Sequence, residues 1–151
     1  MNDTDDSKQL REMVRMLERK FGIVQESEYS CCGITMAQCH ALVEIGRVKS
    51  ISLNELAELL NLENSTMSRT VNNLVTGDLA KRDIDTQDRR YVTISLTESG
   101  YKLYKDIEDG MNLYFRNVYN SIPKNKKQQV LESLQILLEA IDKNENLKEK
   151  T

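Results

Sequence analysis

Apolar residues recur every three or four positions in three long stretches of the chain. The stretches lie at 10–24, 104–122 and 130–141. This spacing places the apolar side chains on one stripe of an α-helix. Pro123 separates the last two stretches, and it suits the start of the final helix because proline interrupts a helix but is tolerated in its first turn. The pattern therefore predicts three long amphipathic helices near the two ends of the chain.

Stripes of this length need a surface that covers them. We expect the segments at about 7–28 and 97–144 to be dimerisation helices that cover one another in a homodimer. A monomeric bundle that packs the same stripes internally is the alternative. With 151 residues, the chain is expected to form a single domain, residues 1–151, that contains these helices.

The middle of the chain is divided into shorter elements. A helix is predicted at about 35–46, with Thr35 as its N-cap. Ser52 and Glu55 have the spacing of a capping box and open a second helix. A third helix is predicted at 64–76, where a glycine ends it. The last two are short and joined by a tight turn, which is the pattern of a helix-turn-helix.

Two short runs with strand character follow, at 79–84 and 91–96, and the second alternates apolar and polar residues. The polar loop between them has the length of a hairpin connection, and Thr97 is the predicted N-cap of the next long helix. The order predicts a mainly α fold with a small β-hairpin wing. A winged helix-turn-helix at about 48–97 is flanked by N- and C-terminal dimerisation helices.

One face of the predicted helix at 64–76 is polar but carries neither acidic residues nor lysine. Arginine can bind a guanine edge by two hydrogen bonds, asparagine an adenine edge, and hydroxyl groups bases or phosphates. An ordinary solvated face is the alternative, but such faces in acidic proteins usually carry glutamate and lysine. The pattern therefore favours DNA binding. The face comprises Ser65, Arg69, Asn72 and Thr76, flanked by Thr66 and Asn73.

The loop of the predicted hairpin carries Arg89 and Arg90. An arginine at the tip of a β-wing can enter the minor groove or pair with phosphates, and Asp88 can orient one guanidinium. A surface salt bridge of little energetic value is the alternative. Lys81 and Arg82 add positive charge on the first strand of the wing.

At this point the sequence resembles the MarR (multiple antibiotic resistance regulator) family of transcription factors over nearly the whole chain. The loop Asp85-Thr86-Gln87-Asp88-Arg89-Arg90 is similar to the family's D-x-x-D-x-R wing. The segment Leu96-Thr97-Glu98-Ser99-Gly100 is similar to the L-T-x-x-G that opens its dimerisation helix. The residues that carry the rest of the resemblance are 53–60, 64–74 and 77–79.

The resemblance implies a homodimer with a winged helix in each subunit. It also implies a repressor of transcription that binds a pseudo-palindromic operator in double-stranded DNA and is released by an effector. A two-fold dimer would place two recognition helices on one face of the duplex about one turn apart. By position, the recognition-helix contacts fall on Ser65, Thr66, Ser68 and Arg69, and the wing contact on Arg89 or Arg90.

Composition adds limits on location and function class. The chain is 30% charged, no apolar run reaches the length of a membrane span, and the polar, acidic start is unlike a secretory signal. We therefore expect a cytoplasmic protein with reduced thiols. The single histidine and the lack of a nucleophile or phosphate-loop motif predict that it is not an enzyme. The net charge of −3 favours one alternative function, a winged-helix protein-interaction module that does not bind DNA.

All three cysteines and the only histidine lie close together, at Cys31, Cys32, Cys39 and His40. In the family, the effector cavity lies near the first two helices and the dimerisation helix, so this segment should border it. One interpretation is a thiol switch, because a cysteine before a helix N-terminus is more reactive toward oxidants. A second is a site for Zn²⁺ or another thiophilic ion. The third is that the cysteines are structural, with a small organic effector in the cavity or no effector at all.

Overall fold

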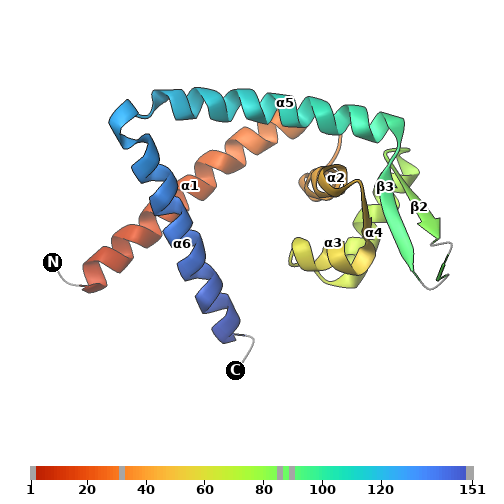
Figure 1. Ribbon diagram of the computed structural model, residues 1–151, viewed down its shortest axis with the longest axis horizontal. Helices are drawn as coiled ribbons and strands as arrows, with labels where there is room; N and C mark the ends of the chain where they lie inside the picture. Colours follow the sequence, from red (N-terminus) through yellow and green to blue (C-terminus); the bar gives the residue numbers. More distant parts are fainter. Residues whose placement is uncertain (1–2, 31–32, 85–86, 89–90, 149–151) are drawn as a thin grey trace. The chain divides into compact units, whose positions relative to one another are not determined.

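The computed structural model describes residues 3–30, 33–84, 87–88 and 91–148 (Figure 1). These residues form six α-helices, a short 3-10 helix and one three-stranded antiparallel sheet. The predicted fold class, mainly α with a small β-hairpin wing, is confirmed. The chain divides into two units, residues 1–110 and 111–151, and the boundary falls within helix α5 (Glu98–Ser121).

Helix α2 (Met36–Val48) lies in the first unit and begins where the sequence predicted. The Thr35 hydroxyl accepts a hydrogen bond from the Gln38 backbone N–H at 3.2 Å, and the Gln38 side chain accepts one from the Thr35 N–H at 2.8 Å. This capping box satisfies two donors that a helix start otherwise leaves unpaired. The inner face of α2 is buried in the core and consists of Cys39, Ala41, Leu42 and Ile45.

Helices α3 (Leu53–Leu59) and α4 (Asn64–Thr76) form the predicted helix-turn-helix. Ser52 caps α3, because its hydroxyl accepts from the Glu55 N–H at 3.1 Å. Helix α4 has the predicted bounds and ends at Gly77. Figure 1 shows α2, α3 and α4 gathered beside the sheet. The side chains that α3 and α4 contribute to the core are Leu56, Ala57, Met67, Thr70, Val71 and Leu74.

The sheet contains the predicted hairpin and one further strand. Strands β2 (Ala80–Ile84) and β3 (Val92–Leu96) form the hairpin, each one residue shorter at its start than predicted. Strand β1 (Ser50–Ser52) was not predicted, because three residues are too few for an alternating pattern. It pairs with β3, so that the strand order is β1-β3-β2 and Ile51 lies opposite Ile94 in the core.

A single residue, Thr97, connects β3 to α5. Its hydroxyl donates to the Asp78 carbonyl at 2.7 Å and accepts from the Gly100 N–H at 3.0 Å, which confirms it as the cap of α5. Gly100 is buried against Leu79, where a Cβ atom would lie 1.8 Å from the Leu79 carbonyl oxygen. The start of α5 is therefore fixed closely to the base of the wing.

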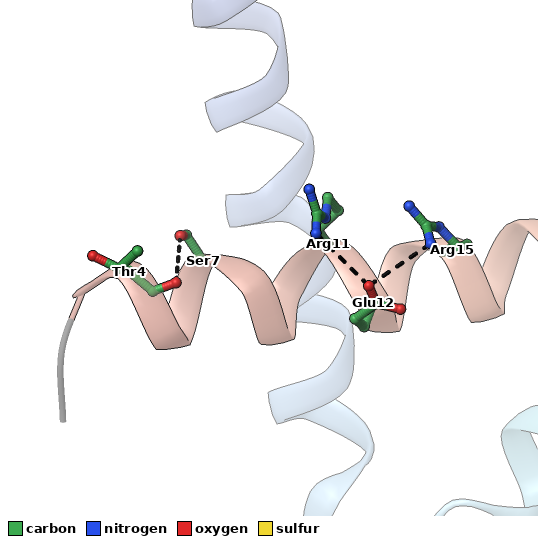
Figure 2. A network of polar contacts seen from close by, with 5 residues as sticks. All are labelled: Thr4, Ser7, Arg11, Glu12 and Arg15. Carbon is green, nitrogen blue, oxygen red and sulfur yellow. Dashed lines mark hydrogen bonds and ion pairs between the residues drawn. The ribbon is translucent and has the colours of Figure 1, made fainter.

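Helix α1 (Asp3–Ser30) is long, and its described side chains are only partly covered. Figure 2 shows polar contacts along it: Arg11 and Arg15 approach the Glu12 carboxylate at 3.9 Å and 3.8 Å. Exposed ion pairs of this kind contribute little stability. Between residues 3 and 22 no side chain is buried. The exposed apolar side chains of α1 are Leu10, Met13, Met16, Leu17 and Phe21.

The second unit contains the end of α5 and helix α6 (Lys127–Lys148). Pro123 precedes a 3-10 turn, η1 (Lys124–Lys126), so the final helix starts slightly later than the proline alone indicates. From residue 111 to 145 no side chain is buried. Exposed apolar side chains in this unit include Leu113, Phe115, Val118, Leu131, Leu134, Leu138 and Ile141. No helix in the described part of the chain has the length and hydropathy of a membrane span.

Candidate nucleic-acid interface

The outer face of α4 presents four of the five predicted recognition residues to solvent. Ser65, Thr66, Arg69 and Asn72 are exposed, and Ser68 is half-buried. The opposite face is held in the core by Met67, Val71 and Leu74, as the helical spacing predicted. Packing of the apolar face therefore fixes which way the polar face points.

Arg69 lies near the middle of this outer face. Its guanidinium has no hydrogen bond or ion pair with any residue in the described ranges. Between Asn64 and Gly77 the helix carries no acidic side chain that would neutralise it. An exposed guanidinium among hydroxyl and amide groups is a donor set suited to base edges and phosphates.

Asn72 is linked to the wing by a contact that the sequence did not predict. The Arg82 guanidinium, in β2, donates a hydrogen bond to Asn72 Oδ1. Local sequence spacing carries no signal for this pair, because it forms only when β2 packs beside α4. Arg82 is therefore both a positive charge of the wing and a partner of the candidate recognition face.

The tip of the wing is described only in part. Arg89 and Arg90 lie outside the described residues, so their predicted contact with DNA stays a prediction. Asp88 is half-buried and has a partner. Beside the tip, the cross-strand pair Ile84 and Val92 is exposed.

Of the four cysteine and histidine candidates, the structure describes Cys39 and His40. Cys39 has no exposed surface, whereas His40, the next residue of α2, is exposed. Successive residues on a helix point about 100° apart, which accounts for the difference. Cys31 and Cys32 lie outside the described residues. Among the residues described, no group of three His, Cys, Asp or Glu side chains could hold a metal ion.

A cleft of about 480 Å³ lies where α2, β3 and α5 meet in the first unit. It occupies the C-terminal end of α2, whereas the cysteine segment precedes the N-terminal end of the same helix. The cleft combines apolar, hydroxyl and charged side chains, and no thiol or imidazole lines it. Its lining residues are Ile45, Gly46, Lys49, Leu96, Thr97, Glu98 and Tyr101.

Known proteins share this sequence pattern and this fold. The family model described as "MarR family" matches residues 34–92, which span α2 to the start of β3. The HTH-type transcriptional regulator YfiV of Bacillus subtilis is 25% identical over 121 residues, covering 80% of this chain and 76% of YfiV. The transcriptional repressor MdtR of the same organism is 24% identical over 118 residues, covering 77% of this chain and 76% of MdtR.

Solved structures extend the likeness to nearly the full length of the chain. Streptococcus pneumoniae FabT, crystallised in complex with DNA, aligns with a TM-score of 0.83 at 16% identity, covering 91% of this chain and 98% of FabT. At that identity the alignment establishes the fold, with its flanking helices, rather than the ligand.

Proposed function

We propose that this chain is a regulator of the MarR family, which binds double-stranded DNA as a homodimer and represses transcription until an effector releases it. The likeness to transcription regulators supports the prediction that the chain is not an enzyme. DNA binding, repression, dimerisation and the effector are each supported by a different feature.

The outer face of α4, hereafter the recognition helix, carries the proposal of DNA binding. It is free of acidic side chains, although the whole chain has a net charge of −3, and it presents Arg69 without a carboxylate partner in the described residues. A local surface of donors in an acidic protein is expected where a polyanion binds. FabT was crystallised with DNA, and MdtR is named a repressor, which supports the same role here.

Substitution of Arg69 tests this proposal directly. Arg69→Ala removes a donor pair suited to a base edge, and we expect it to weaken operator binding by about 1–3 kcal/mol and to relax the preference at one base pair. Fluorescence anisotropy with the DNA segment just upstream of this protein's own gene, and with duplexes selected from a random library, measures both effects. Wild-type binding should also weaken as salt rises.

Arg47→Ala is the matched control, because it removes the same charge from α2, where Arg47 pairs with Glu44 at 3.4 Å. We expect it to change DNA affinity little. Equal affinity of wild type and the Arg69→Ala variant for every duplex would contradict the role of the recognition helix. Absence of any bound duplex would favour the alternative of a protein-interaction module.

Exposed apolar faces support the homodimer. Helix α1 and the second unit together carry long apolar stripes, and no described side chain in 3–22 or 111–145 is buried. Phe115 is 43% exposed and Leu134 45% exposed. Exposed apolar stripes along long helices mark an interface. A second copy of the chain supplies matching stripes, as a two-fold interface requires.

The cleft between α2, β3 and α5 is the position that we propose for a small-molecule effector. Its wall includes Leu96, the last residue of β3, and Glu98, the first residue of α5. A ligand bound there would contact both the wing, through β3, and the proposed dimerisation helix α5. An oxidant or a thiophilic ion such as Zn²⁺ would instead act through Cys31 and Cys32, since the buried Cys39 is not accessible.

A further inference from the structure

The side chains of Asn72 and Arg82 tie the recognition helix to the wing. Asn72 lies on the exposed face of α4, and Arg82 lies in β2. The Arg82 guanidinium donates to Oδ1 of Asn72. A guanidinium has only donors, so the atom of the carboxamide that faces it must be the oxygen, and Nδ2 is left to point elsewhere.

The surroundings of Arg82 leave this contact in place. Neighbouring residues of a strand point to opposite faces, so Asp83 is turned away from Arg82. The Asp83 carboxylate accepts instead from the Ser95 hydroxyl at 3.4 Å. Within the described ranges Arg82 has no ion pair that would compete with Asn72. Both side chains are exposed, so the pair is accessible to a ligand of the recognition helix.

The pair alters what Asn72 can read. Asparagine recognises adenine by two hydrogen bonds, in which Oδ1 accepts from N6 and Nδ2 donates to N7. Here one of the two lone pairs of Oδ1 accepts from Arg82, so most of the groups that the pair offers a ligand are N–H donors of Asn72 and of the guanidinium. Guanine presents two acceptors, N7 and O6, in the major groove. A surface rich in donors therefore matches guanine better than adenine, whose amino group is itself a donor.

We infer that Arg82 is a specificity-determining residue, which holds the Asn72 carboxamide so that the pair selects guanine rather than adenine. This inference rests on the proposed DNA binding. Arg82 positions Asn72 and adds its own N–H groups to the same surface.

Selection of duplexes from a random library, followed by competition binding, tests the inference. Asn72→Ala first identifies the base pair that Asn72 reads, as the position whose preference is lost. Wild type is expected to prefer G·C there by about 5- to 150-fold, the range for a good bidentate contact. Arg82→Met keeps the aliphatic stem but frees Oδ1, and it is expected to move the preference at this position to A·T.

Two further variants separate positioning from charge. Arg82→Lys retains a donor for Oδ1 and is expected to keep the preference for G·C. Lys81→Met removes one positive charge from the neighbouring position of β2, which is also exposed. It is expected to lower affinity for all duplexes alike and to leave the preference unchanged.

Several results would overturn the inference. One is a wild-type preference for A·T at the Asn72 position, and another is an unchanged preference in Arg82→Met. A uniform loss of affinity in Asn72→Ala, with every base preference retained, would place Asn72 on the phosphates and have the same consequence. Each of these outcomes leaves the proposed DNA binding standing. If wild type selects no duplex at all, the proposed function fails and this inference fails with it.

Discussion

Gly100 allows the first turn of α5 to lie against the backbone of Leu79. A Cβ atom at this position would come within 1.8 Å of the Leu79 carbonyl oxygen, which is backbone and cannot rotate aside. Gly100→Ala must therefore displace the helix or the start of the wing. We expect it to lower the free energy of unfolding by about 1–3 kcal/mol, the usual cost of overpacking. Urea unfolding followed by circular dichroism measures the change.

Gly22→Ala is the control for this substitution. Gly22 lies within α1, and a Cβ atom there would meet nothing within 4 Å. Alanine favours a helix over glycine by up to about 1 kcal/mol, so the control is expected to be neutral or stabilising. Equal destabilisation by both substitutions would show that the contact with Leu79 is not the cause.

Of the three cysteines, Cys39 is buried in the core, and Cys31 and Cys32 lie outside the described residues. Replacement of the fully buried Cys39 by serine would bury a hydroxyl and lower the free energy of unfolding by about 1–3 kcal/mol. A variant that includes it could lose its response to oxidation through this loss of stability alone. We therefore expect the double variant Cys31→Ser with Cys32→Ser to bind the operator as wild type does and to lose any response to mild oxidation. Anisotropy titrations of reduced and oxidised protein make the comparison. A response that persists in the double variant removes these two thiols from the mechanism.

At the scale of the elements, Thr97 links the end of β3, the start of α5 and the turn that follows α4. Its hydroxyl bonds to Asp78 at 2.7 Å and to the Gly100 N–H at 3.0 Å. Thr97→Val keeps the shape and removes both bonds, so we expect a loss of about 0.5–2 kcal/mol, the range for a helix cap. Thermal and urea unfolding measure it.

Thr93→Val serves as the comparison for Thr97→Val. The Thr93 hydroxyl donates to the Asp83 carbonyl at 3.3 Å between paired strands, and valine suits a strand well. We expect the change in unfolding free energy to stay within about 0.5 kcal/mol. If Thr97→Val is no more destabilising than this, the hydroxyl of Thr97 does not hold α5 to the wing.

Local signals explain which elements the sequence could predict. Thr35 and Ser52 mark helix starts because their own hydroxyls form the caps. Gly77 marks the end of α4 because it is the C-cap residue, a position near which glycine is common. The second strand of the hairpin was predicted from its alternation of apolar and polar residues. Strand β1 was not predicted, because its three residues form a strand only through their pairing with β3, which local sequence does not reveal.

The same reasoning explains the candidate site. The outward direction of Arg69 follows from the apolar spacing of α4, so helical geometry alone could predict it. The contact of Asn72 with Arg82 depends on how α4 and β2 pack, and the cleft depends on three elements meeting. Burial of Cys39 likewise follows from its position on α2, whereas the chemistry of the cysteines could not be read from their clustering.

At the scale of the whole molecule, the proposed dimer depends on the apolar faces of the long helices. Leu134 lies on the apolar stripe of α6. Ile136 is also exposed, at 67%, but it lies on the opposite side of the same helix. We expect Leu134→Lys to place a charge in the interface and shift the protein toward monomer. Sedimentation velocity over a range of protein concentrations measures this shift.

Ile136→Lys adds the same charge outside the apolar stripe. Its new ammonium would lie one turn from Glu132 and Glu139, which favours the helix slightly. This variant is expected to remain dimeric. A monomer in both variants, or a dimer in both, would contradict the assignment of the stripe as the interface.

The one-residue connection at Thr97 also limits how the length of the chain can vary. Strand β3 ends at Leu96 and α5 begins at Glu98, and backbone and side-chain bonds to Asp78 and Leu79 occupy the residue between them. An inserted residue would have no surface loop to enter, and it would turn every later side chain of α5 by about 100° around the helix axis. Changes of length are therefore expected to be accommodated at the tip of the wing, between α5 and α6, or at the two ends of the chain.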